Sequence, residues 1–202
     1  SITERLAEIG TLFGQNVLAD EASFMLELDG PDDLAGLPES LVAAAAEAAA
    51  ERGLPGKHVI TLSRSSIEPF LQFSTRRDLR EKAFKAWIAR GANGGKTDNR
   101  KIIAEILDLR VQSAHLLGYK NAAESALQFS MAKTPANVRK LLMEVWEPAR
   151  RRAEEERAQL QDAVRTEGGN FQVEAWDWRY YAEKVRKAKY DIDEAEIKPY
   201  LQ

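Results

Sequence analysis

The sequence predicts a mainly α fold: a helical domain with long antiparallel helices and at most a small β-hairpin element. Apolar residues recur every three or four positions along most of the 202 residues, which is the spacing of one helical face. Capping residues and glycines stand where these segments begin and end. Only the segment from Lys57 to Leu62 is rich in β-branched residues, as strands are.

The N-terminal part of the chain predicts two helices and a pair of short strands. Ser1 and Glu4 have the spacing of a capping box at the start of the first helix. The alanine-rich residues 43–50 predict a second helix that ends at Gly53. Residues 24–28 are the candidate partner of the strand at 57–62, and the serines at 63–66 indicate a turn. The apolar stripe of the first helix consists of Ile2, Leu6, Ile9, Phe13 and Val17.

The C-terminal part predicts further helices over residues 76–90, from Asn99 to Gly118, from Asn121 to about Phe129, and over residues 182–189. The expected buried face of the second of these consists of Ile102, Ile106, Leu109 and Leu116. Asp191 or Asp193 is expected to cap a final turn.

Thr134 and Pro135 predict the start of a long helix that extends to Gly168, because a capping hydroxyl precedes a proline at the first helical position. Pro148 lies inside this helix, so we expect a kink or a break near Trp146. The apolar stripe of the long helix consists of Val138, Leu142, Val145, Ala149, Ala153, Leu160 and Val164.

The composition excludes several classes of function. The sequence has no Cys, and its two histidines, His58 and His115, do not form the His-Glu-x-x-His pattern of a zinc peptidase. We therefore expect no catalytic residue, no cofactor and no metal ligand in these residues, and interpret both histidines as ordinary structural ones. A net charge of −3 argues against nucleic-acid binding, and no apolar run has the length of a membrane span.

The densest aromatic segment runs from Trp176 to Tyr181. Its side chains are candidates for lining a peptide channel or groove. The alternative, which we favour, is that they anchor the last helix on the long one. Asp177 is expected to cap a helix, and Arg179 to pair with a carboxylate. The channel candidates are Trp176, Trp178, Arg179, Tyr180 and Tyr181.

Several of these segments together resemble the thimet oligopeptidase family of zinc metallopeptidases, in particular its bacterial peptidyl-dipeptidase and oligopeptidase A branch. The resemblance covers nearly the whole chain and rests on the order and spacing of short motifs. These motifs lie at residues 76–90, 97–99, 109–110, 114–119, 131–135 and 176–184.

The resemblance implies a helical, two-lobed enzyme with a deep, narrow channel, whose zinc site lies C-terminal to the matched region. Residues 1–202 are then one helical domain of a longer peptidase, with a possible sub-boundary near residues 54–75. The chain begins with Ser1 rather than Met, which also favours a piece of a longer protein. We expect this piece to be an inactive segment of the channel wall, N-terminal to the catalytic region.

Zinc, short peptide substrates and a catalytic lobe are expected only in the parent enzyme, which is expected in the bacterial cytoplasm. Release of C-terminal dipeptides is favoured over internal cleavage, although the sequence leaves both open. The alternative function is a standalone helical module that binds a partner protein through the surface formed by residues 176–181.

Overall fold

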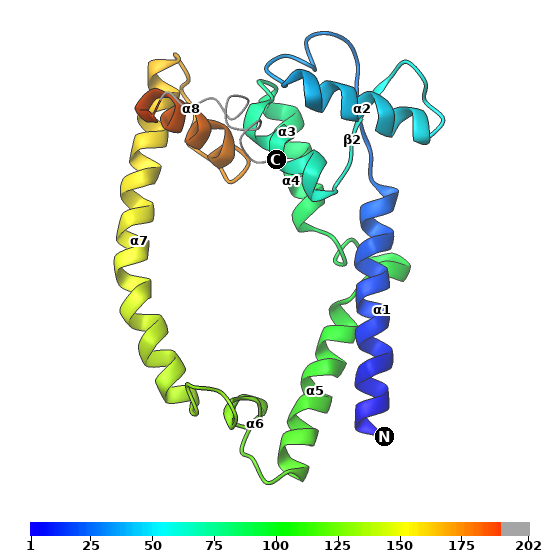
Figure 1. The fold of residues 1–202 in the computed structure, drawn as a ribbon, viewed down its shortest axis with the longest axis vertical. Helices are drawn as coiled ribbons and strands as arrows, with labels where there is room; N and C mark the ends of the chain where they lie inside the picture. The colour runs from blue at the N-terminus through cyan, green and yellow to red at the C-terminus, as the bar shows by residue number, and fades with distance from the viewer. Residues whose placement is uncertain (191–202) are drawn as a thin grey trace, which may run out of the picture. The chain divides into compact units, whose positions relative to one another are not determined.

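The computed structural model describes residues 1–190, and these are mainly helical with one small sheet, which confirms the predicted fold class (Figure 1). In chain order the elements are α1 (Ile2–Ser23), β1 (Leu26–Leu28), α2 (Glu39–Glu51), β2 (His58–Ile60), α3 (Arg64–Phe73), α4 (Arg77–Ile88), the 3₁₀ turn η1 (Gly95–Thr97), α5 (Arg100–Leu116), α6 (Ala122–Leu127), α7 (Pro135–Thr166) and α8 (Trp178–Tyr190). None of these helices combines the length and the apolar character needed to cross a bilayer.

The chain forms two compact units. The first contains Ser1–Asp20 and Ala89–Glu154, and the second contains Glu21–Ile88 and the residues from Glu155 onward. The chain therefore passes from one unit to the other within α1, at the end of α4 and within α7. That residues 1–202 fold as one domain stays a prediction.

The second unit has its main core around the small sheet. β1 pairs antiparallel with β2, with Leu26 opposite Ile60, as the strand pairing predicted from sequence requires. The connection between the two strands is not a tight turn, because it contains α2. Leucine, isoleucine and phenylalanine side chains from the sheet, α2 and α3 fill the core, and Ala83 of α4 closes it.

In the first unit, α1 and α5 lie side by side and run in opposite directions (Figure 1). Two contacts define this pairing: Arg5 donates to Glu105 at 2.5 Å, and the amide of Asn16 donates to Asn99 at 2.8 Å. Ile9, from the predicted stripe of the first helix, is buried at 1% exposure. The predicted long antiparallel helices are therefore present in this unit.

Three helix ends form where the sequence signals predicted them. The capping box is complete, because Ser1 donates its amine to Glu4 at 2.7 Å and accepts the Glu4 amide at 3.3 Å. Gly53 ends α2 with φ +76°. Thr134 accepts the amide of Asn137 at 3.2 Å at the start of α7. Each of these signals acts on a helix end within a few residues of its own position.

The structure differs from the predicted elements in three places. The serines at 63–66 do not form an isolated turn, since α3 begins at Arg64 and extends through Pro69. Of the kink or break expected near Trp146, the break is absent, because α7 is continuous from Pro135 to Thr166, and the kink stays a prediction. Leu116, expected on a buried face, is 79% exposed, because it is the last residue of α5.

The other members of that predicted face, at 102, 106 and 109, are only half-buried, and Ala114 is the buried residue of α5. The proposed caps Asp191 and Asp193 lie outside the described residues.

Candidate functional site

The aromatic segment predicted from sequence lies at the start of α8, in the second unit. Before α8, residues 171–177 cross the end of α7, where Leu160 and Val164 pack against Val173 and Tyr181. This small core is separate from the one around the sheet. It fixes the start of α8, and with it the positions of all five channel candidates.

Asp177 is the centre of the segment. Its side chain is 0% exposed and accepts hydrogen bonds from two arginines of α4: Arg80 at 2.9 Å, and Arg77 through Nη2 at 2.9 Å and Nε at 3.1 Å. It also accepts the backbone amide of Glu174 at 3.1 Å. A buried carboxylate is stable only when such partners replace its hydration, and Asp177 has them on both oxygens.

Arg80 is buried to 1% exposure and uses its remaining donors on backbone carbonyls. It donates to Ser74 at 2.7 Å and to Trp176 at 3.3 Å, and its guanidinium lies 4.1 Å from the ring centre of Tyr180. Arg77, beside it, lies 4.2 Å from the ring centre of Phe171. Two arginines and one aspartate leave a formal charge of +1, which the electron-rich faces of these rings help to accommodate.

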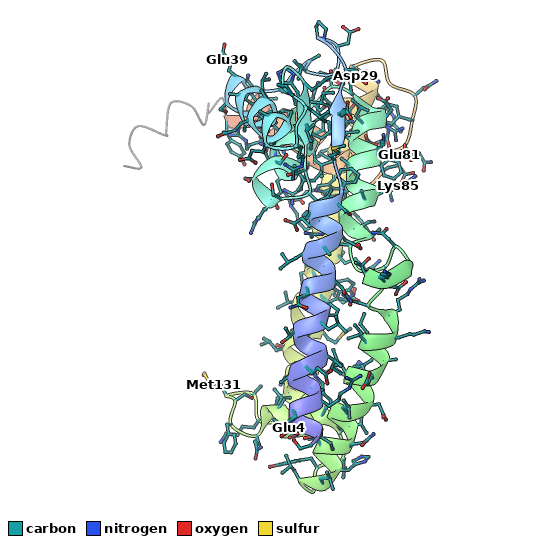
Figure 2. All side chains as sticks on the ribbon, turned by 90° about the vertical axis from the view of Figure 1, so that its right-hand side faces the viewer. Glu4, Asp29, Glu39, Glu81, Lys85 and Met131 are labelled. Atoms are coloured by element: carbon teal, nitrogen blue, oxygen red, sulfur yellow. The ribbon has the colours of Figure 1, made fainter. Side chains whose placement is uncertain are left out.

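The other channel candidates are also packed. Trp176 is half-buried, lies edge-on to Phe84 with ring centres 6.5 Å apart, and has Lys85 at 5.1 Å from its ring centre. Its indole N–H is buried and has no hydrogen-bond partner among the described residues. Lys85 also pairs with Glu81 on the same helix (Figure 2). Trp178 is half-buried against the small core.

Tyr180 and Tyr181 contact each other edge-to-face, with ring centres 5.1 Å apart. Tyr181 is 5% exposed, and its burial raises the pKa of the phenol. Arg179 is exposed and pairs with Glu68 of α3 at 3.2 Å, as the predicted pairing with a carboxylate requires. The structure thus brings the five candidates together and places most of their surface inside the protein.

A second polar cluster, which the sequence did not reveal, lies in the first unit around Asp20. This carboxylate accepts the backbone amide of Gly91 at 2.7 Å, the side chain of Asn93 at 2.9 Å and the hydroxyl of Thr97 at 2.5 Å. The hydrogen bond from Thr97 is the main cause of a lowered pKa at Asp20. The cluster holds the glycine-rich connection between α4 and α5 against α1.

The residues present do not fit a zinc site. Within residues 1–190, His, Asp and Glu side chains form no group of three that could hold a metal ion. His58 begins β2 and is half-buried, and His115 is exposed on α5 with its Nε2 3.1 Å from the carbonyl of Lys120. His58 and His115 belong to different units. The contacts around Asp177 hold the start of α8 against α4.

Comparison with known proteins identifies the family. The model of "Peptidase family M3" matches residues 70–202. The dipeptidyl carboxypeptidase of Escherichia coli K12 is 38% identical over 196 residues, which are 97% of this chain and 29% of that protein. Oligopeptidase A of the same organism is 36% identical over 204 residues, 99% of this chain and 30% of that protein.

A plant relative, the probable cytosolic oligopeptidase A of Arabidopsis thaliana, is 33% identical over 209 residues, 99% of this chain and 29% of that protein. The chain thus spans less than a third of the length of these relatives. Because the family model covers well over half of the chain and the relatives align with nearly all of it, the chain belongs to peptidase family M3.

Proposed function

We propose that residues 1–202 form a non-catalytic, helical part of the channel wall of a zinc-dependent peptidase that acts in the cytoplasm on short peptides and releases C-terminal dipeptides. The observation that carries this proposal is the combination of family membership with a fold of long helices, in which residues 1–190 form no group of three side chains that could hold a metal ion. A relative named dipeptidyl carboxypeptidase supports dipeptide release.

The long helices supply what a channel wall needs. α7 has 32 residues, which corresponds to a rod of about 48 Å. A helix satisfies its own backbone hydrogen bonds, so it can border a channel without offering unpaired groups to a passing peptide. A narrow channel with stiff walls admits an extended peptide and excludes a folded domain. In this proposal the wall sets the size of the substrate, and the zinc site elsewhere in the parent enzyme cleaves it.

The buried cluster around Asp177 stiffens this wall. It joins α4 to the start of α8 through charged hydrogen bonds that stacked rings enclose. Arg179, whose side chain is exposed, is the channel candidate that a peptide could reach most easily. Because its guanidinium pairs with Glu68 at 3.2 Å, the carboxylate end of a peptide would compete with Glu68 for it. Tyr181, in contrast, would act by holding α8 in place.

Zinc content and turnover test the proposal. The 202-residue chain is expected to hold less than stoichiometric zinc by mass spectrometry and to leave a quenched-fluorescent peptide intact. The full-length protein encoded by the same gene is expected to cleave the peptide until a chelator is added. Stoichiometric zinc and chelator-sensitive turnover in the 202-residue chain would overturn the assignment of this part as non-catalytic.

The full-length protein separates the proposal from its alternative. A full-length protein that cleaves no peptide, whatever metal is supplied, would favour the standalone interaction module. Analysis of the products of a peptide ten residues long would then distinguish dipeptide release from internal cleavage, because only the former gives a ladder that shortens by two residues.

A further inference from the structure

Most of the N-terminal half of α7 is exposed on all sides. Every residue from 139 to 155 is exposed. Helices in proteins owe most of their stability to packing of an apolar face against other elements, and an isolated helix in water is marginal. Among the described residues of its own unit, this half of α7 has no such packing, so a surface outside that unit must stabilise it.

The apolar stripe of α7 continues from a covered part into an uncovered part. Towards the C-terminus of the helix, Leu160 and Val164 are 4% and 0% exposed, because they pack against Val173 and Tyr181. About four to six turns earlier on the same face, Leu142 and Val145 are 61% and 59% exposed. The neighbouring Trp146 is 57% exposed. One helical face is thus buried at one end and bare at the other.

Other large apolar side chains of the first unit are also exposed. On α5, Ile103, Leu107 and Val111 stand four residues apart and are 43%, 57% and 40% exposed. Between α6 and α7, Phe129 is 92% and Met131 101% exposed, and Figure 2 shows Met131 projecting away from the ribbon. Monomeric soluble proteins rarely expose so much apolar surface, whereas obligate interfaces resemble a core cut in half.

A permanent partner explains this surface better than a substrate does. A peptide substrate leaves after each turnover, so it would leave the stripe bare between reactions. The relatives that align with nearly all of this chain have more than two thirds of their length outside the aligned region. That much polypeptide is large enough to cover the stripe, and it is always present in the same molecule.

We propose that the stripe of α7 formed by Leu142, Val145 and Trp146 is a docking surface for polypeptide of the same peptidase chain outside residues 1–202. This proposal rests on the proposed function, because it requires a parent enzyme longer than this chain. The opposite face of the helix, which contains Arg151, stays in water.

Cysteine reactivity tests the docking surface directly, because residues 1–202 contain no Cys. Val145→Cys changes the size of the side chain little, and Arg151→Cys on the opposite face is the matched control. Each variant is made in the 202-residue chain and in the full-length protein, and labelling by a maleimide is followed by mass spectrometry of the peptide that contains the cysteine. We expect labelling at position 145 to be at least tenfold slower in the full-length protein, with position 151 unchanged.

The other outcomes overturn the proposal. Equal labelling of Val145→Cys in both proteins would show that the stripe is not covered. A second copy of the chain would cover the stripe if position 145 were protected from labelling in the 202-residue chain alone. That protection would disappear on dilution, and light scattering would show a dimer. Leu142→Cys repeats the test if Val145→Cys does not fold.

The labelling readout is independent of turnover. A full-length protein that protects position 145 but cleaves no peptide would contradict the proposed function and leave the docking surface in place. A full-length protein that cleaves the peptide but does not protect position 145 would contradict the docking surface and leave the proposed function in place.

Discussion

The carboxylate of Asp177 and the guanidinium of Arg80 meet at 2.9 Å, with exposures of 0% and 1%, across 97 positions of sequence. Removal of one partner from a buried ion pair leaves the other charge without compensation. Asp177→Asn is therefore expected to lower the free energy of unfolding by about 3 kcal/mol. Urea denaturation followed by circular dichroism measures this loss.

The matched control is an exposed ion pair. Glu154→Gln removes one of the two carboxylate partners of Arg150, which lies at 3.0 Å with both side chains more than half exposed. Such pairs contribute little, so a change within about 0.5 kcal/mol is expected. If Asp177→Asn and Glu154→Gln cost the same, the buried pair does not hold α8 to α4 in the way proposed here.

Local signals in the sequence predicted most of the helices. The capping box at Ser1, the glycine at 53 and the Thr134–Pro135 pair each act within a few residues of where they stand, so the sequence shows both partners at once. The missed helix α3 has a weaker signal: its first turn is rich in serine, and Pro69 stands in its interior. Its burial on the sheet, through Ile67 and Phe70, outweighs these poor helix residues.

The candidate site could be predicted only in part, because its partners are distant in sequence. The aromatic segment is visible as a composition, and the pairing of Arg179 with a carboxylate was expected. The sequence did not predict the contact of Arg77 and Arg80 with Asp177, because a charged helix such as α4 is usually solvated. The cluster around Asp20 joins residues more than 70 positions apart, and the sequence around it gives no sign of this contact.

Glycine substitutions provide a second test of the packing in the second unit. A Cβ at Gly36 would lie 2.4 Å from the carbonyl of Phe73, and the residue has φ +84°. Gly36→Ala therefore combines a backbone clash with left-handed strain and is expected to cost about 3 kcal/mol or more of unfolding free energy. Thermal denaturation measures the loss as a fall in Tm.

Gly53 is the control for the strain alone. It has φ +76°, but a Cβ there meets nothing within 4 Å. Gly53→Ala is expected to cost only about 1 kcal/mol, the price of a left-handed alanine. Equal losses at the two positions would mean that the connection before α2 can move away from α3.

Pro148 offers a test of the continuous long helix. A proline inside a helix lacks the N–H that would bond the carbonyl four residues earlier, and its ring crowds the preceding turn. Because α7 nevertheless runs through Pro148, and position 148 is exposed, Pro148→Ala is expected to stabilise the protein by about 1 to 3 kcal/mol. Urea denaturation gives the change. Destabilisation would instead show that the helix requires a bend at this position.

The lowered pKa of Asp20 makes a prediction about acid. A carboxylate whose pKa is lower in the folded than in the unfolded protein stabilises the fold above its unfolded pKa of about 3.9 and loses this contribution as pH falls through the folded pKa. Asp20→Asn is therefore expected to destabilise the protein clearly at pH 6 and progressively less below pH 4. Urea denaturation at pH 6, 4 and 3 measures this convergence of the two stabilities.

Asp162→Asn, which removes an exposed partner of Arg165, is the control and should change stability little at any pH. A constant difference between Asp20→Asn and the unmodified protein across this range would show that Asp20 acts only through shape and not through its charge.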